Sequence, residues 1–255
     1  GQLDINLNED EKGPEISQDL FGLFFEDINY GADGGLYGEL IKNRSFEYPQ
    51  PLMGWNTIGD VVVKDDGPFN RCPHYVRLSY SGKRDMATGI ENRGFLGMSL
   101  LGGEQYRFTV WARVPEDGEA QLNIGLRDLD SQEENFTSCE TDINVCGSEW
   151  SKYTVVLTTP YTIKKASLTV FLKGTVPVDV EHISLFPVNT WHGHENGLRK
   201  DLAQHLANLK PGVMRFPGGC IVEGATLDTR YNWKHSIGTV ENRPLNETRW
   251  NYGKE

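Results

Sequence analysis

The sequence predicts a β-rich mixed fold, in which an antiparallel β-sandwich is inserted into the crossover of a βαβ unit. Two observations carry this prediction. Short segments of alternating apolar and polar residues, separated by Gly, Pro, Asn and Asp, fill the middle of the chain, as in a sandwich. On either side lies a short apolar run typical of buried parallel strands, and a helical pattern precedes the second run.

Residues 1–50 form the first predicted domain. The run Leu20–Phe25 is almost entirely apolar and is followed at once by Glu26 and Asp27. This pattern predicts a strand that is covered on both faces and ends in a polar loop. A Gly-Gly pair then precedes residues 36–47, where the spacing of the apolar residues predicts a short helix.

Residues 51–190 form the predicted sandwich. In the segment 106–114, every second residue is apolar and the residues between are mostly polar, which predicts a strand with one buried face. Similar alternation, with frequent turn signals, occurs in six further segments, which read VVVKDDG, HYVRLSYSG, AQLNIGLRD, KYTVVLTTP, ASLTVFLKG and VDVEHISLF. A domain of this size is tolerated as an insertion when its two ends lie close together.

Residues 191–255 form the third predicted domain. Leucines at helical spacing predict a helix that ends at Pro211 and Gly212. The apolar run Val213–Phe216 then predicts a short buried strand, which breaks on Pro-Gly-Gly. The predicted order is therefore strand, sandwich, helix, strand.

Composition and charge exclude several classes of partner. The 255 residues include 36 acidic and 25 basic ones, giving a formal net charge of -11, and no run of Lys and Arg is present to bind a phosphate backbone. We therefore expect no nucleic-acid partner. No apolar stretch approaches the roughly 18 residues of a membrane span. We expect a protein that is secreted, periplasmic or on the cell surface, with any signal peptide already removed.

The four cysteines suggest one possible disulfide and no metal site. Cys139 and Cys146 lie seven positions apart across a polar segment, so they could close a small loop in an oxidising compartment. Two free thiols are an equally good interpretation. Cys72 and Cys220 have no evident partner, and no His or Cys cluster has ligand spacing. We expect no metal and no cofactor.

Polar side chains follow both predicted parallel strands. Glu26 comes directly after the first strand, and Cys220 and Glu223 follow the glycine turn after the second. In parallel α/β folds, ligands bind at the carboxyl ends of the strands. The alternatives stay open at this point: Glu26 as a solvated loop carboxylate, Cys220 as a small buried residue, and Glu223 as the partner of an arginine.

Three stretches carry a resemblance to a known family. They are ISQDLFGLFFEDINYGADGGLYGELIKNRSFE, GLRKDLAQHLANLKPGVMRFPGGCIVEG and YNWKHSIGTVENRP. Together they resemble the amino-terminal part of the glycoside hydrolase family 51 α-L-arabinofuranosidases, in the branch with an inserted sandwich. The resemblance implies a jelly-roll, carbohydrate-binding-module-like β-sandwich, inserted into the first βα unit of an incomplete (β/α)8 barrel.

The resemblance also implies roles for individual residues. Glu26 matches a glutamate that hydrogen-bonds the hydroxyls of the arabinofuranosyl unit before the cleaved bond. Cys220 stands where other branches have an asparagine that contacts the same sugar, and Trp233 would line the mouth of the site. Arg215, Gly218 and Gly219 would shape the strand end. Four aromatic residues nearby could form a core or a sugar pocket, namely Tyr231, Trp233, Trp250 and Tyr252.

The family cleaves with retention of configuration by means of two glutamates. In the family both lie on later barrel strands, so we expect no catalytic residue in this segment and no activity from it alone. The implied function is that of the amino-terminal portion of a retaining α-L-arabinofuranosidase, which removes terminal arabinofuranosyl units from arabinan- or arabinoxylan-type polysaccharides.

Two alternatives to the enzyme interpretation remain. The sandwich could be a non-catalytic carbohydrate-binding module, with Trp111 and Tyr153 as candidate contacts, although core packing or a domain contact suits both better. It could also be a structural spacer. The expected partner is an arabinose-containing polysaccharide or oligosaccharide. Apolar surface on the incomplete barrel also makes self-association possible.

Overall fold

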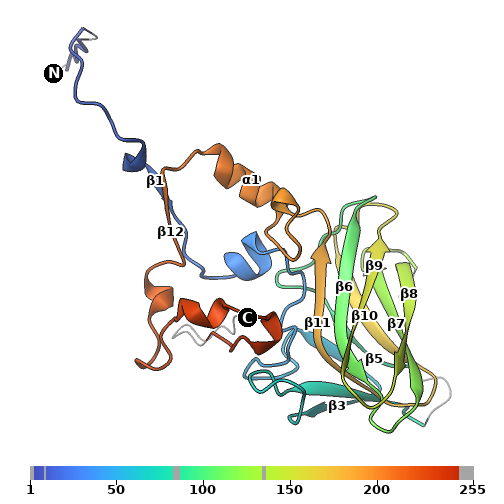
Figure 1. The fold of residues 1–255 in the computed structure, drawn as a ribbon. Helices are drawn as coiled ribbons and strands as arrows, with labels where there is room; N and C mark the ends of the chain where they lie inside the picture. The colour runs from blue at the N-terminus through green and yellow to red at the C-terminus, as the bar shows by residue number, and fades with distance from the viewer. Residues whose placement is uncertain (1–2, 9, 83–86, 134–135, 247–255) are drawn as a thin grey trace.

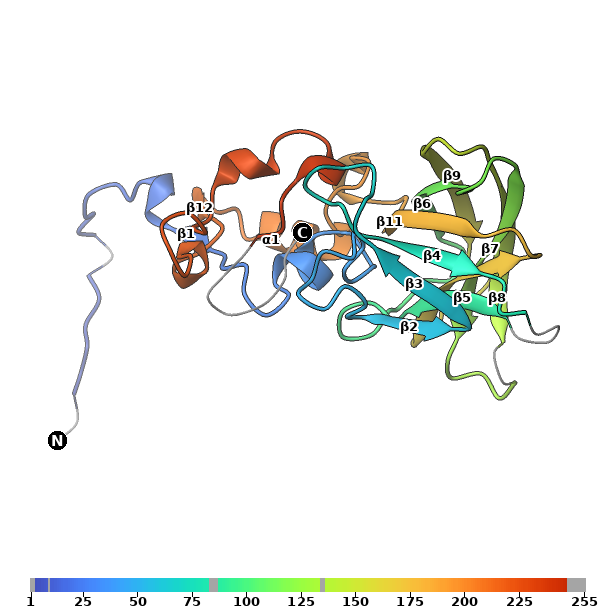
Figure 2. The ribbon, with the colours of Figure 1, turned by 90° about the horizontal axis from the view of Figure 1, so that it is seen from below.

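The computed structural model describes residues 3–8, 10–82, 87–133 and 136–246. Its larger part is a β-sandwich, and its smaller part combines a two-stranded parallel sheet, one α-helix and loops. The smaller part lies beside one end of the sandwich (Figures 1 and 2). None of the helices in the described ranges has the length and apolar character to cross a membrane.

The sandwich consists of two five-stranded sheets, in which every neighbouring pair is antiparallel. The first sheet has the order β2 (Trp55–Ile58), β5 (Thr88–Asn92), β10 (Ala166–Lys173), β7 (Glu119–Asp128) and β8 (Thr137–Cys146). The second has the order β3 (Asp60–Lys64), β4 (Tyr75–Ser79), β11 (Val178–Pro187), β6 (Gln105–Arg113) and β9 (Ser151–Thr158). The predicted antiparallel sandwich is confirmed.

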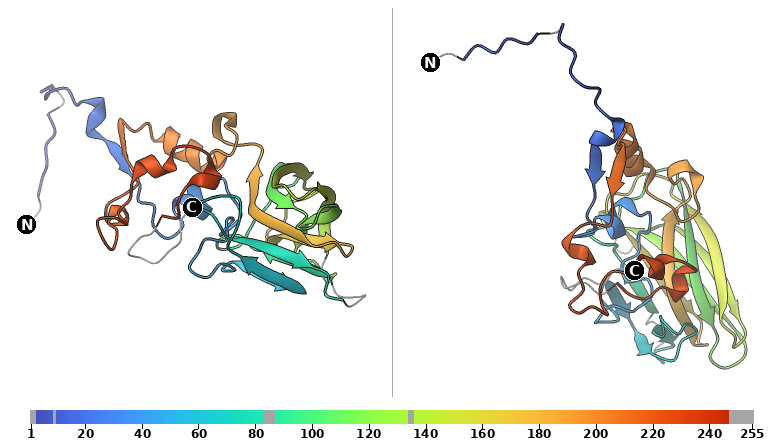
Figure 3. Two further views of the ribbon diagram at one scale, coloured as in Figure 1. Left: turned by 60° about the horizontal axis from the view of Figure 1, so that its bottom comes forward. Right: turned by 60° about the vertical axis from the view of Figure 1, so that its left-hand side comes forward.

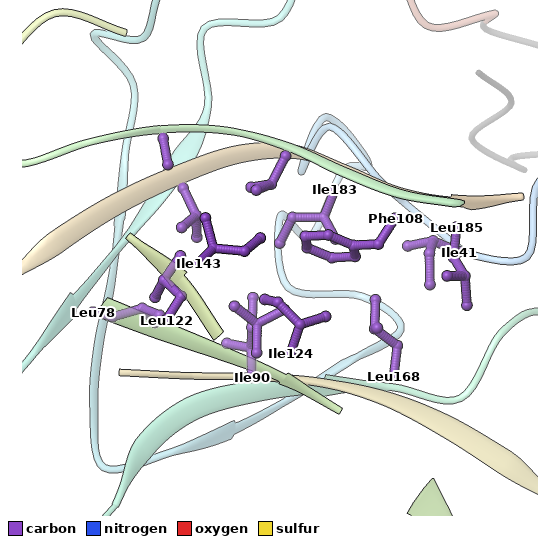
Figure 4. Close-up of a cluster of buried hydrophobic side chains, with 14 of the residues drawn as sticks. Ile41, Leu78, Ile90, Phe108, Leu122, Ile124, Ile143, Leu168, Ile183 and Leu185 are labelled. Carbon is purple, nitrogen blue, oxygen red and sulfur yellow. The ribbon is translucent and has the colours of Figure 1, made fainter. Parts of the chain in front are cut away.

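Side-chain alternation fills the space between the sheets. On β6 the alternate residues from Tyr106 to Ala112 are buried, while those between them are only partly covered. Apolar side chains from both sheets meet in one core, which includes Leu78, Ile90, Phe108, Leu122, Ile124, Leu168 and Leu185 (Figure 4). The period-2 pattern therefore predicted both the strand and its buried face.

The smaller part has the predicted βαβ order. Strand β1 (Gly22–Phe24) lies beside and pairs in parallel with β12 (Val213–Arg215) (Figure 3). In this pairing Gly22 lies opposite Val213. Helix α1 (Lys200–Asn208) precedes β12 and lies between the strand pair and the sandwich. The sandwich thus occupies the crossover between two adjacent parallel strands.

The predicted burial of these two strands is wrong in this structure. Phe24 is 57% exposed, and all three residues of β12 are exposed. In the described part of the chain each strand has the other as its only pairing partner, so no neighbouring strand covers the apolar side chains.

The predicted helix over residues 36–47 is also wrong. A short helical turn covers Ala32–Leu36, and the chain beyond it follows turns and loops. Asn43 and Phe46 have φ angles of 56° and 60°, which an α-helix does not allow. Ile41 and Phe46 are instead fully buried, and both belong to the sandwich core. Tertiary packing overrode the local helical pattern.

Buried Glu39 fastens this loop to β11. Its carboxylate accepts hydrogen bonds from the backbone N–H of Leu185 (2.9 Å) and Ile41 (3.0 Å) and from the Ser184 hydroxyl. Its Oε2 also lies 3.2 Å from Arg44 Nη1, and both side chains are 3% exposed. Burial raises the pKa of Glu39, against the opposing effect of Arg44 and the three donors. The loop adds two backbone hydrogen bonds, Leu40 N–H to Leu185 O and Ile183 N–H to Arg44 O.

Arg44→Met tests this joint. The change leaves the Glu39 carboxylate buried without its cation, so we expect a loss of about 3–5 kcal/mol in the free energy of unfolding. Arg93→Met is the matched control, because Arg93 is largely exposed in its pair with Glu91 and should cost no more than about 1 kcal/mol. Urea unfolding of both variants provides the measurement. Equal losses would contradict a special role for the Glu39–Arg44 pair.

Candidate functional site

The carboxyl ends of β1 and β12 bring Glu26 against the glycine turn. The Oε1 atom of Glu26 accepts hydrogen bonds from the backbone N–H of Gly219 (3.1 Å) and Ile221 (3.4 Å). The backbone adds two bonds at the same place, from Phe25 N–H to Arg215 O and from Asp27 N–H to Pro217 O. The parallel pairing therefore holds the Glu26 carboxylate in one orientation at the strand end.

Gly218 allows this close approach. A Cβ atom at this position would lie 2.5 Å from Glu26 Cγ and 2.9 Å from Glu26 Cα. Its φ of 140° is also one that other residues rarely adopt. At the end of β12, the Arg215 guanidinium lies over the Phe24 ring, 4.7 Å from its centroid, and Nη2 reaches the Gly218 carbonyl at 3.5 Å. Arg215, Gly218 and Glu26 thus form one packed unit, named here the strand-end cluster.

Cys220 and Trp233 lie on short helical turns after the strand end. Cys220 begins the turn Cys220–Val222 and is exposed, so the interpretation as a small buried residue is wrong. Trp233 begins the turn Trp233–Ser236 and is 60% exposed. The predicted aromatic neighbours Trp250 and Tyr252 lie outside the described residues.

Cys139 and Cys146 do not form a disulfide. Both thiols are free, and the two residues lie on the same extended strand, β8. Seven residues of strand span about 23 Å, whereas the Cα atoms of a disulfide lie about 4.4–6.8 Å apart. The two residues are therefore too far apart to bridge, and the alternative of two free thiols is correct.

A pocket of about 460 Å³ opens beside the strand-end cluster. Three of its lining residues, Asp27, Phe216 and Pro217, adjoin members of the cluster in the sequence. The far wall comes from the loops after the glycine turn and includes Tyr231, Asn232, His235 and Arg243. Glu26, Cys220 and Trp233 are not among the lining residues. Glu26 accepts a hydrogen bond from the lining residue Ile221, and Cys220 and Trp233 directly precede or follow lining residues in the sequence, so all three lie just outside the pocket.

Sequence reasoning missed part of this wall. In the sequence His235 is an isolated histidine, which does not by itself indicate a site. Arg243 has no feature that indicates a site, apart from its place in the motif that resembles the family. The loop that carries them is fastened to the sandwich by Glu241, which accepts hydrogen bonds from Trp111 Nε1 (3.1 Å) and Lys152 Nζ (2.9 Å). Burial raises the pKa of Glu241, but Lys152, a backbone N–H and Trp111 together lower it to about 2. Such long-range contacts leave no local pattern.

The aromatic residues considered for a sugar-binding face are engaged elsewhere. Trp111 donates to Glu241 and packs edge-on against Phe69, with ring centroids 5.2 Å apart. The Tyr153 hydroxyl accepts a hydrogen bond from Cys146 N–H at 3.1 Å. Both side chains therefore support local packing. In the described ranges, no group of three or more His, Cys, Asp or Glu residues is arranged to hold a metal ion.

The arrangement suits recognition of a small polyhydroxylated ligand. An oriented carboxylate accepts hydrogen bonds from hydroxyl groups, and the amide and imidazole groups of Asn232 and His235 can donate or accept. Phe216 and Tyr231 supply apolar surface in the same pocket. A pocket with convergent polar groups and apolar walls is the usual form of a small-molecule site.

Two family descriptions match the chain. Residues 38–178 match the carbohydrate binding domain, which is more than half of the chain. Residues 205–255 match the alpha-L-arabinofuranosidase 1 domain. The matched ranges contain most of the sandwich and the site-bearing carboxyl-terminal part, respectively.

The chain is also similar to individual arabinofuranosidases. It is 35% identical over 271 residues to an extracellular exo-alpha-L-arabinofuranosidase of Streptomyces chartreusis, covering 98% of this chain and 31% of that protein. It is 34% identical to alpha-L-arabinofuranosidase 1 of Arabidopsis thaliana, covering 91% and 36%. The chain spans about a third of the length of these curated relatives.

A solved structure extends the similarity to the fold. The arabinose-bound MgGH51 α-L-arabinofuranosidase superimposes with a TM-score of 0.81 at 27% identity, covering 93% of this chain and 40% of that one. The match includes both the sandwich and most of the smaller part, because it extends over nearly all of this chain.

Gly218→Ala tests the strand-end cluster. The added methyl group would overlap the Glu26 side chain, so we expect a loss of about 1–3 kcal/mol in stability. We also expect large shifts of the Gly219 and Ile221 amide signals in NMR spectra. Gly147→Ala is the control, because Gly147 also has a positive φ but has no neighbouring atom within 4 Å of an added Cβ. Unchanged Gly219 and Ile221 signals in the Gly218 variant would contradict the packing described.

Proposed function

We propose that this chain has a role in arabinofuranoside hydrolysis. Over residues 38–178 it belongs to the carbohydrate binding domain family, and it corresponds to the amino-terminal region of the glycoside hydrolase family 51 α-L-arabinofuranosidases. As part of a longer enzyme it would help remove terminal arabinofuranosyl units, with retention, from arabinan- or arabinoxylan-type polysaccharides. We propose that this enzyme is secreted, periplasmic or on the cell surface; one relative is named as extracellular.

The orientation of Glu26 is the observation that carries this proposal. Oε1 is held by two backbone N–H groups, and we assign Oε2 to the hydroxyls of an arabinofuranosyl unit. Gly218, Gly219 and Arg215 would keep the carboxylate in place. Cys220, exposed at the start of its turn, and Trp233 would line the edge of the sugar site. The arabinose-bound relative supports a sugar site on this fold.

We further propose that the catalytic carboxylates are contributed by chain outside these 255 residues. Retention requires an acid/base and a nucleophile about 5–5.5 Å apart. Glu26 is the carboxylate that this chain places at the strand end, and its Oε1 atom already accepts hydrogen bonds from two backbone N–H groups. Residues 1–50 and 191–255 would be parts of a (β/α)8 barrel interrupted by the sandwich of residues 51–190. The exposed apolar side chains of β1 and β12 would be covered by further barrel strands or, in this chain alone, by self-association.

A second candidate function is non-catalytic carbohydrate binding by the sandwich. The match of residues 38–178 to a carbohydrate binding domain favours it. The contacts of Trp111 and Tyr153 speak against these two residues as the binding surface. A purely structural spacer would show no affinity for any saccharide.

Glu26→Ala should weaken binding of methyl α-L-arabinofuranoside at least tenfold. The expected size follows from the loss of hydrogen bonds to a charged acceptor, about 1.5–3 kcal/mol. Isothermal titration calorimetry of this chain provides the measurement. Glu119→Ala is the control, because Glu119 is exposed at the start of β7 in the sandwich. Equal affinity of wild type and the Glu26 variant, or no affinity in either, would contradict the assignment.

The chain alone should not release arabinose from p-nitrophenyl α-L-arabinofuranoside. The physical reason is the proposed absence of the catalytic pair, without which neither leaving-group protonation nor nucleophilic attack occurs. A spectrophotometric assay at high protein concentration checks this, with a full-length family member as the positive control. Turnover that scales with the concentration of this chain would place catalytic residues within it.

A further inference from the structure

A large groove separates helix α1 from the sandwich. Its volume is about 910 Å³, and it is lined by residues of the loop before β6 and the start of that strand, by Lys164 and Lys165, by the end of β11 and by helix α1. We name it the helix groove. It shares one lining residue, Tyr37, with the pocket beside the strand-end cluster, so the two hollows are neighbours.

Helix α1 presents a polar face to the groove. Lys200, Gln204 and Asn208 recur every fourth position, which places them on one side of the helix. The Gln204 amide donates to Asn208 Oδ1 at 2.8 Å, and Lys200 Nζ donates to Asn189 Oδ1 at 3.2 Å. Each amide has two donor hydrogens and an oxygen with two lone pairs. These two hydrogen bonds use only part of this capacity, so the wall can both donate to and accept from a ligand.

The opposite wall is apolar. Leu96 and Leu101, from the loop before β6, are 88% and 60% exposed. Met98 and Tyr106 are largely buried and also line the groove, and the Tyr106 hydroxyl accepts a hydrogen bond from Leu101 N–H at 2.7 Å, which fixes this part of the loop. Two exposed leucines on an ordered wall form a surface that gains free energy when a ligand covers it.

The two walls together fit a neutral oligosaccharide. A sugar ring offers hydroxyls to amide groups on one side and C–H groups to leucine side chains on the other. Charge is nearly balanced, because the lining contains four Lys and Arg side chains and three carboxylates, and Arg199 pairs with Asp201. The volume lies at the upper end of the roughly 300–1,000 Å³ of ligand sites, which suits several linked units better than one.

We propose that the helix groove binds a neutral oligosaccharide segment of the polysaccharide whose arabinofuranosyl unit is held at the strand-end cluster. This inference rests on the proposed function for the class of ligand. A second contact on the same polymer raises the apparent affinity for long chains over single units, because the second binding event is intramolecular. The groove would therefore contribute to a preference for polymeric substrates.

The double variant Gln204→Ala/Asn208→Ala tests the groove. Both positions are exposed and alanine favours helices, so the fold should persist. Calorimetric titration of the whole chain with a neutral arabinoxylan pentasaccharide should show at least fivefold weaker binding than in wild type. Affinity for methyl α-L-arabinofuranoside should stay unchanged. Glu26→Ala should show the opposite pattern, with the greater loss for the single unit.

Gln121→Ala/Asn123→Ala is the matched control. It removes the same pair of side chains from β7, where they bond Asn144 and Asp142 on the surface of the sandwich. Unchanged pentasaccharide affinity in this variant supports the groove. Weaker pentasaccharide binding in this β7 variant, with unchanged binding in the helix variant, would overturn the proposal in favour of the sheet face. Equal affinity of wild type and the helix variant for the pentasaccharide overturns the groove alone, whereas failure of wild type to bind either ligand overturns the proposed function as well.

Discussion

The joint made by Glu39 supports the arrangement of both parts of the chain. It fastens the loop after β1 to β11, because Ser184 and Leu185 of β11 and Arg44 of the loop itself all engage one buried carboxylate. Breaking a buried pair is costly because it leaves an uncompensated charge out of water. The loop on the other side of the site is fastened through Glu241 to Trp111 and Lys152. Two carboxylates thus hold the smaller part against the sandwich.

The strand-end cluster depends on these joints because its own sheet is small. Strands β1 and β12 pair over three residues and bury little surface. Precise placement of the Glu26 carboxylate therefore needs the surrounding loops to be held elsewhere, as at many sites where supporting contacts fix a functional side chain. The sandwich provides that support on the side where the Tyr231–Arg243 wall also rests.

In the proposed function, the two hollows would divide the recognition of an extended substrate. The smaller one, beside Glu26, has a volume of about 460 Å³ and the helix groove one of about 910 Å³, and both lie within the range of small-molecule sites. Their shared wall at Tyr37 is anchored by Phe186 of β11, with ring centroids 5.2 Å apart, and by the Arg44 guanidinium above its ring. The same joint that holds the two parts together therefore also shapes the boundary between the hollows.

The sequence by itself determined the alternation of the sandwich strands, the strand, helix, strand order around it, and the glycine turn beside Glu26. These features depend on neighbours within a few residues, and the resemblance to arabinofuranosidases rests on the same local motifs. Only the tertiary structure decided that residues 36–47 leave the helical pattern, that Cys139 and Cys146 stand apart on one strand, and that Ser184 meets Glu39 from 145 positions away. Glu26 likewise meets the Gly219 and Ile221 amides across 193 and 195 positions. Such contacts form only when whole sheets and loops pack together, because both polar partners must be brought together and removed from water. A local window of sequence contains only one of the two partners, so it cannot predict the contact.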